Sequence, residues 1–125
     1  MKYDEFITSV AELAGLTREE AESLTRASLR VLAQRLSGGE AEDLRAQLPQ
    51  QLKEELVAPQ ANAQAFGVEE FARRVAEDVG SSEADAAAAV VAVLATLRKA
   101  VTPGEFDDVL SQLGREFAAL TDADR

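Results

Sequence analysis

The sequence predicts an all-α protein, a compact helical bundle of two duplicated three-helix units with about six principal helices. Within residues 85–101 lies an apolar run, 86–97, in which only Thr96 is polar. A helix that is apolar all round must be covered on every side. The run is shorter than the roughly 17–25 apolar residues of a membrane span, so it indicates a central bundle helix. In addition, the chain repeats its own pattern at an offset of 65 residues.

The composition narrows the class of protein. The chain has 125 residues, of which 46% are apolar, and this is enough for one packed domain, 1–125. The formal charge is −10, from 23 acidic and 13 basic residues. This excess of acid argues against nucleic-acid and anionic-lipid partners, because both bind clustered Lys and Arg. Since no hydrophobic leader is visible, we expect a cytoplasmic protein with no membrane partner and no nucleic-acid partner.

The first unit, about 3–57, opens with two helices. The first has apolar residues at helical spacing, and Gly15 supplies its left-handed stop. The second begins at residues 17–20, which have the spacing of a capping box, and is expected to run to about Leu36. The apolar positions of the first helix are Phe6, Ile7, Val10, Leu13 and Ala14.

The third helix of this unit begins at a second capping box, residues 37–40. Pro49 must kink this helix or restart it, because proline lacks an N–H and clashes with the preceding turn. The positions expected to be buried are Ala41, Leu44, Leu48, Leu52 and Leu56.

The pattern returns in the second unit, about 66–120, after an uncharged linker at about 58–65. A frayed tail, 121–125, is expected to close the chain. The repeat implies an internal duplication. Matched pairs at the offset of 65 are Phe6 with Phe71, Val10 with Val75, Gly15 with Gly80, and Gln47 with Gln112.

The helix starts and the break recur as well. Residues 82–85 and 102–105 stand where the capping boxes stood, and Gly114 occupies the position of the proline. Phe66 and Phe71 have the spacing of a hydrophobic staple at the start of the second unit. Three short helices bury too little surface to be stable alone, so the two units are expected to pack on each other.

One helix face differs between the two copies. The charged residues Glu19, Glu22, Arg26 and Arg30 of the first copy align with Ala84, Ala87, Val91 and Ala95 of the second. The charged version is interpreted as a solvated, ion-paired face. The apolar face of the second copy should be covered, because Val and three Ala gain nothing from contact with solvent. It either packs against the first unit or forms an interface with another copy or a partner protein.

A polar line recurs beside the apolar stripe of each third helix. Asp43 and Gln47 lie one turn apart, as do Asp108 and Gln112. The structural interpretations are that Asp and Gln pair along the helix, or that they bind a neighbouring helix end, with Gly39 permitting close approach. The functional interpretation is a polar contact ridge for a partner.

No catalytic, cofactor or metal site is predicted. The sequence contains no His and no Cys, so the commonest general base, the thiol nucleophile and nitrogen or sulfur metal ligands are missing. Carboxylates fall at helix starts and on polar faces, and the pattern places no pair of acids on a buried face. We therefore expect no enzymatic activity, no cofactor and no built metal site.

One stretch, residues 35–49, reads Arg-Leu-Ser-Gly-Gly-Glu-Ala-Glu-Asp-Leu-Arg-Ala-Gln-Leu-Pro. It is similar to the hallmark of an uncharacterised bacterial family, domain of unknown function 2267. The opening residues 3–6 and 14–16 look like the start of the same family. Residues 101–108 keep the pattern in the second copy, although Gly114 replaces the proline. The resemblance implies a compact, all-helical, tandem-repeat fold and brings no activity or catalytic residues.

These observations predict a non-enzymatic interaction module that binds a protein partner or self-associates. The alternative is a carrier of a small apolar ligand between the two units, where Ala88, Ala89 and Ala92 would leave room. The predicted core is Phe6, Val10, Leu13, Leu24, Leu32, Leu48, Phe71, Val75, Val90, Leu94, Leu97, Leu113 and Phe117.

Overall fold

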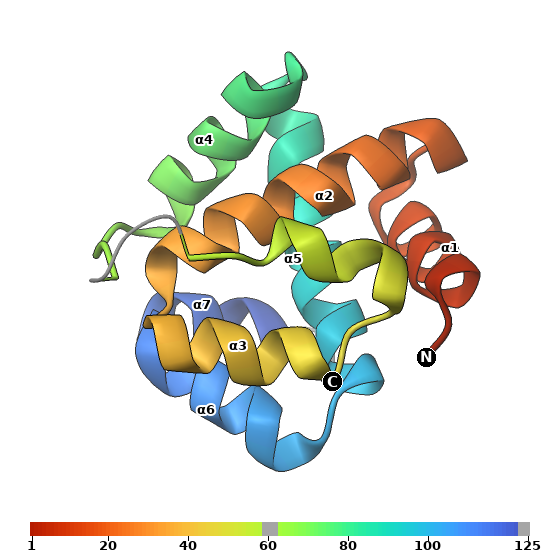
Figure 1. Ribbon diagram of the computed structural model, residues 1–125. Coiled ribbons are helices and arrows are strands. Elements are labelled where there is room, and N and C mark those ends of the chain that lie inside the picture. Colours follow the sequence, from red (N-terminus) through yellow and green to blue (C-terminus); the bar gives the residue numbers. More distant parts are fainter. Residues whose placement is uncertain (59–62, 123–125) are drawn as a thin grey trace.

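The computed structural model describes residues 1–58 and 63–122, which fold as helices without any strand. This confirms the all-α prediction (Figure 1). The elements are α1 (Tyr3–Ala14), α2 (Arg18–Arg35), α3 (Gly38–Ala46), the 3-10 helix η1 (Gln50–Glu55), α4 (Val68–Val79), α5 (Glu83–Ala100), α6 (Pro103–Leu113) and α7 (Arg115–Asp122).

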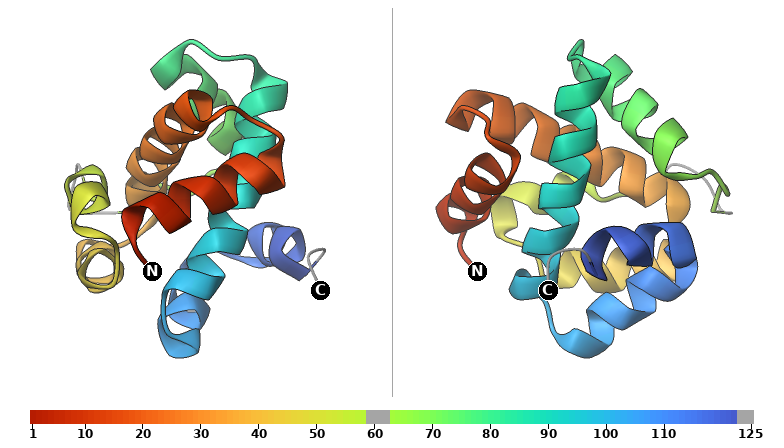
Figure 2. Two further views of the ribbon diagram at one scale, coloured as in Figure 1. Left: turned by 90° about the vertical axis from the view of Figure 1, so that its right-hand side faces the viewer. Right: turned by 180° about the vertical axis from the view of Figure 1, so that it is seen from behind.

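Helix α5 is the centre of the bundle. It packs against α1, α2, α4, α6 and α7, and in Figure 2 it crosses α2 with the other helices arranged around the pair. Thr96, the polar residue of the apolar run, is fully buried, and its hydroxyl shares a hydrogen bond of 2.8 Å with Ser9 of α1. The apolar run is therefore a covered helix, and its one hydroxyl finds a partner inside the fold.

Local signals set the helix ends. Gly15 and Gly80 end α1 and α4 in the left-handed conformation, with φ of 69° and 70°. Glycine adopts this conformation without the steric cost that a Cβ imposes. At the start of α2, Thr17 and Glu20 form the reciprocal capping box that the sequence predicts.

Both third helices are broken, as predicted. Pro49 separates α3 from η1, which carries the buried Leu52, and Gly114 (φ 94°) separates α6 from α7. Helix α7 continues through Asp122 with Thr121 buried, so the predicted frayed tail begins too early. Residues 123–125 of that tail lie outside the described residues.

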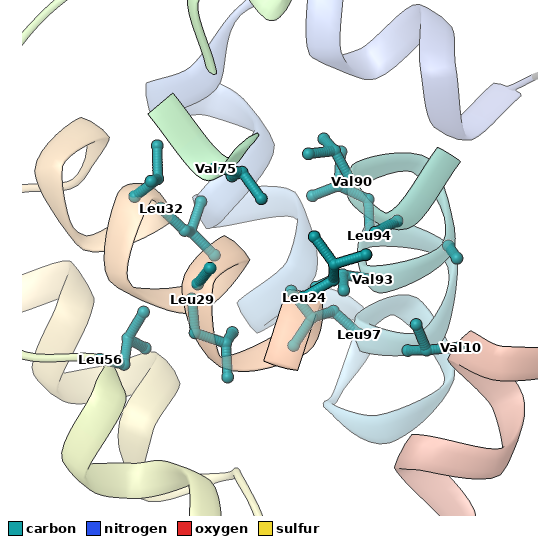
Figure 3. Close-up of a cluster of buried hydrophobic side chains, with 14 of the residues drawn as sticks. Val10, Leu24, Leu29, Leu32, Leu56, Val75, Val90, Val93, Leu94 and Leu97 are labelled. Atoms are coloured by element: carbon teal, nitrogen blue, oxygen red, sulfur yellow. The ribbon is translucent and has the colours of Figure 1, made fainter. Parts of the chain in front are cut away.

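The predicted core is confirmed at every position except Leu13. Figure 3 shows part of this core, with Val10, Leu24 and Leu97 among the labelled side chains. Leu13 is 50% exposed, whereas Phe6, Ile7 and Val10 are fully buried. Leu13 lies in the last turn of α1, which ends at Ala14. Its exposure is a correction to the sequence-based core.

The elements of the two halves keep the predicted offset. Helices α1 and α4 begin at positions 3 and 68, α2 and α5 at 18 and 83, and α3 and α6 at 38 and 103. The staple is also confirmed, since the rings of Phe66 and Phe71 lie 6.1 Å apart between centroids. Descent of the two halves from one duplicated unit stays a prediction, and residues 59–62 of the linker lie outside the described residues.

Within the described residues, no single helix is long and apolar enough to cross a membrane. Only α4 and α5 taken together, bent by 111°, reach that length and composition.

Candidate functional site

Helices α3 and α6 lie side by side (Figure 1), and two glutamines join their ends. Gln47 Oε1 accepts the N–H of Thr102 at 2.8 Å, and its Nε2 donates to the Thr102 hydroxyl at 3.4 Å. Gln112 Oε1 accepts the N–H of Ser37 at 2.8 Å, and its Nε2 donates to the Ser37 hydroxyl at 3.2 Å. Each helix thus caps the start of the other, an arrangement that we call the glutamine clasp.

The clasp changes the role of the glutamates at the third position of α3 and α6. The N-cap hydroxyls accept the N–H groups of Glu40 and Glu105, at 3.2 Å and 3.3 Å, as in a capping box. The N-cap N–H groups, which a capping-box glutamate would accept, are taken by the glutamines. The predicted reciprocal box at residues 37–40 is therefore wrong in its second half, and both carboxylates are free to lie elsewhere.

Those carboxylates meet between the two helices. One oxygen each of Glu40, Asp43 and Glu105 lies within 4.8 Å of the other two, and we call this set the carboxylate cluster. Glu105 is 8% exposed and Glu40 is half-buried. Apart from the contact between the two carboxyl groups themselves, the buried Oε2 atoms of Glu40 and Glu105 find no hydrogen-bond partner among the described residues. The expectation that no acids pair on a buried face is therefore wrong.

The cluster perturbs the acidity of Glu105. Its pKa is raised from 4.5 to about 8, first by burial, then by a hydrogen bond with Glu40 and by the negative charges of Glu40, Asp43 and Asp108. The raised pKa favours a proton held between the carboxyl groups of Glu105 and Glu40 near neutral pH. The cluster can therefore hold a proton, or a cation with a preference for oxygen ligands.

A sequence signal for the cluster existed. Glu40 and Gln47 are seven residues apart, as are Glu105 and Gln112. Residues at i and i+7 lie on one helix face, so a glutamine that reaches a neighbouring helix carries the glutamate toward the same neighbour. Because both glutamates also have the spacing of capping residues, the sequence alone did not indicate that they meet between the two helices.

The predicted polar ridge is divided by the structure. Gln47 and Gln112 bind the neighbouring helix start, which was one of the predicted alternatives. Asp43 joins the carboxylate cluster and Asp108 is not one of its three members, although both residues are exposed. Gly39 does not serve close approach, because a Cβ at this position would meet no atom within 4 Å.

The predicted interface on α5 is only partly covered by the chain itself. Ala84 and Ala87 are exposed, Val91 is half-buried and Ala95 is buried. Packing within the bundle therefore accounts for the end of this face near Ala95, and the start of the face remains open.

The aligned face of α2 is not a set of solvated pairs along one helix. Arg26 and Arg30 bind the two carboxylate oxygens of Glu55 in η1 at 2.8 Å and 2.7 Å, and Arg30 also binds Asp78 of α4 at 2.7 Å. Burial raises the pKa of Glu55, but the hydrogen bonds from both arginines outweigh it and leave the pKa below its ordinary value. This face holds η1 and α4 against α2.

A surface hollow of about 490 Å³ lies along α1 and reaches the end of α5. Leu13 contributes apolar surface to it, and Met1 is 43% exposed at its edge. We call it the α1 hollow. Its lining residues are Met1, Asp4, Glu5, Thr8, Ser9, Glu12, Leu13 and Lys99.

Comparison with known proteins agrees with the sequence resemblance. The family model described as "Uncharacterized conserved protein (DUF2267)" matches residues 3–120, which include both helices of the glutamine clasp. No curated protein matches the chain. Because the match covers nearly the whole sequence, the chain belongs to the family of uncharacterized conserved proteins DUF2267.

Proposed function

We propose that the protein is a non-enzymatic interaction module that binds a basic amphipathic helix of a partner protein in the α1 hollow. The observation that carries this proposal is Leu13, a large apolar side chain that is 50% exposed inside a surface hollow. Full burial of a leucine side chain contributes about 1.5–3 kcal/mol, so covering the exposed half of Leu13 would stabilise a complex by about half of that. The apolar face of a helix can cover Leu13 and Met1, while its flanks meet the polar residues of the lining.

The charges around the hollow define the partner further. Asp4, Glu5 and Glu12 line it against one basic residue, Lys99, and the whole chain carries a formal charge of −10. Asp4 is also paired with Arg18 at 2.6 Å, which leaves the other two acids for a partner. A basic segment would be attracted and oriented by this field.

The test uses a labelled synthetic helix with leucines on one face and lysines on the other, with binding followed by fluorescence anisotropy. We expect Leu13→Ser to weaken binding by about threefold to tenfold. Val57→Ser is the matched control, because Val57 is 54% exposed and does not line the hollow. Equal binding by wild type and Leu13→Ser would contradict the proposal. So would equal binding of a peptide with the same composition and a scrambled order.

Self-association through α5 is the second candidate function. Ala84 and Ala87 expose small apolar side chains next to the half-buried Val91, and small residues let helices approach closely. Light scattering coupled to size-exclusion chromatography gives the mass in solution. If this face joins two copies, Ala87→Glu produces a folded monomer and Ala119→Glu, another exposed helical alanine, keeps the dimer. A wild-type monomer would remove this candidate.

The carrier alternative has less support. Three alanines were expected to leave room for a ligand. Ala89 and Ala92 are 0% and 2% exposed and belong to the main cluster of packed core side chains, whereas Ala88 is half-buried. A carrier would require these residues to line an enclosed cavity.

A further inference from the structure

The carboxylate cluster concentrates negative charge where the protein supplies no compensating cation. None of the ion pairs between described residues involves Glu40, Asp43 or Glu105. Asp108 adds a further negative charge close to Glu105. Buried charges in proteins are normally paired or bound to a metal, because removing them from water is costly.

The burial of Glu105 is a second observation that points to a ligand. Glu105 is 8% exposed, and the hydrogen bond of its carboxyl group is with another acid, Glu40, while its buried Oε2 receives no N–H or hydroxyl group from the described residues. Glu40 Oε2 is in the same situation on the other helix. Ionised carboxylates only accept hydrogen bonds, so two facing carboxylates need a proton or a cation between them.

We propose that Glu40, Asp43 and Glu105 bind a calcium ion that joins α3 to α6. The three oxygens lie within 4.8 Å of one another. Calcium binds oxygens at about 2.3–2.6 Å, so two of its ligands can be at most about 5.2 Å apart. The spacing of the three oxygens falls inside this limit, so one ion can contact all three carboxylates through side-chain adjustment alone.

The helix geometry holds the three ligands together. Glu40 and Asp43 are three residues apart on α3, a spacing that puts both on one face, and Glu105 comes from α6. The glutamine clasp keeps both glutamates out of the capping role. Two of the ligands therefore belong to one helix and the third to its neighbour, so the bound ion would strengthen the α3–α6 contact directly.

The ligand chemistry favours calcium over other metals. All three ligands are oxygens, and the chain has no His or Cys to attract zinc or copper. Magnesium demands a near-ideal octahedron at about 2.0–2.1 Å and gives up its waters reluctantly, whereas calcium accepts irregular sets of carboxylate ligands such as three side chains from two helices. Three carboxylates do not complete the six to eight ligands of calcium, and water would supply the others.

The first test is isothermal titration of the full chain, stripped with a chelator, with CaCl₂ at about pH 8.5, where the carboxylates are ionised. We expect one saturable site in the wild type. Glu105→Gln and Glu40→Gln should each weaken binding by about tenfold or more, since each removes a charged ligand. Glu42→Gln, an exposed glutamate on α3, is the matched control and should bind like the wild type.

Thermal unfolding with CaCl₂, MgCl₂ or NaCl at equal ionic strength is the second test, and it also reports whether each variant folds. Calcium should raise the melting temperature of the wild type and of Glu42→Gln, magnesium should raise it less, and Glu105→Gln should lose the increase. Absence of saturable calcium binding in the wild type would overturn the proposal and leave a shared proton as the link between the two glutamates. An equal loss of affinity in Glu42→Gln would also overturn it, because diffuse surface charge would then explain the binding.

Discussion

Gln112 at the end of α6 caps the start of α3 through Ser37: its Oε1 accepts the Ser37 N–H at 2.8 Å, and its Nε2 donates to the Ser37 hydroxyl at 3.2 Å. Gln47 repeats the contact on Thr102 from the other helix. A side chain distant in sequence thus satisfies a backbone group that local capping usually satisfies.

Removal of the clasp should destabilise the protein. Gln112→Ala leaves the N–H of Ser37 without its partner, so we expect the free energy of unfolding to fall by about 0.5–2 kcal/mol in urea denaturation. Gln50→Ala is the control, because Gln50 is exposed on η1. Equal stability of the two variants would show that the clasp contributes nothing.

Phe71 should be one of the most sensitive core positions. It is 2% exposed, and its ring lies 5.5 Å from that of Phe117 and 6.1 Å from that of Phe66, between centroids. We expect Phe71→Ala to cost roughly 3–5 kcal/mol in chemical unfolding. Leu13→Ala is the comparison and should cost less than about 1 kcal/mol, because that side chain is half-exposed. A loss under about 1 kcal/mol for Phe71→Ala would remove it from the core.

Glu105 should make the metal-free protein less stable as pH rises. Its pKa is about 8 in the folded state against an ordinary value of 4.5, so between these values the folded chain binds more protons than the unfolded chain. The free energy of unfolding should therefore fall from about pH 4.5 to about pH 8. Urea unfolding at several pH values with a chelator measures this slope.

Glu105→Gln should flatten that dependence and stabilise the metal-free protein at the alkaline end, because an amide has no charge to bury. Glu42→Gln, the exposed control, should keep the wild-type slope. An unchanged slope in Glu105→Gln would assign the pH dependence to other groups.

Glu55 should matter more than its surface location implies. Its side chain is 12% exposed and bridges Arg26 and Arg30, whereas the neighbouring Glu54 is 81% exposed. We expect Glu55→Gln to cost about 1–3 kcal/mol and Glu54→Gln to cost almost nothing. The pKa of Glu55 is lowered, so this stabilisation is present above about pH 4.5 and is lost as pH falls through the folded-state pKa. Equal effects of the two substitutions would contradict the bridging role.

The sequence by itself determined the local architecture. Gly15, Gly80 and Pro49 end or break helices through the conformations that their own backbones allow. Thr17 caps the start of α2 through hydrogen bonds with Glu20, which is three residues away. The spacing of apolar residues located the core, because burial follows helical periodicity. This prediction failed at Leu13, because the side of α1 that is covered depends on the neighbouring helices.

Only the tertiary structure decided which groups from distant segments meet. Arg35 illustrates this: its Nη2 donates to the carbonyl of Leu113 at 2.5 Å, and its guanidinium lies over the rings of Phe66 and Phe117. The carboxylate cluster has the same origin. In the sequence, Glu40 and Glu105 have the spacing of capping residues, and only the placement of α6 beside α3 brings their carboxyl groups together. Local sequence constrains groups within about one helical turn, whereas these contacts depend on how two helices cross, which the packing of the whole bundle sets.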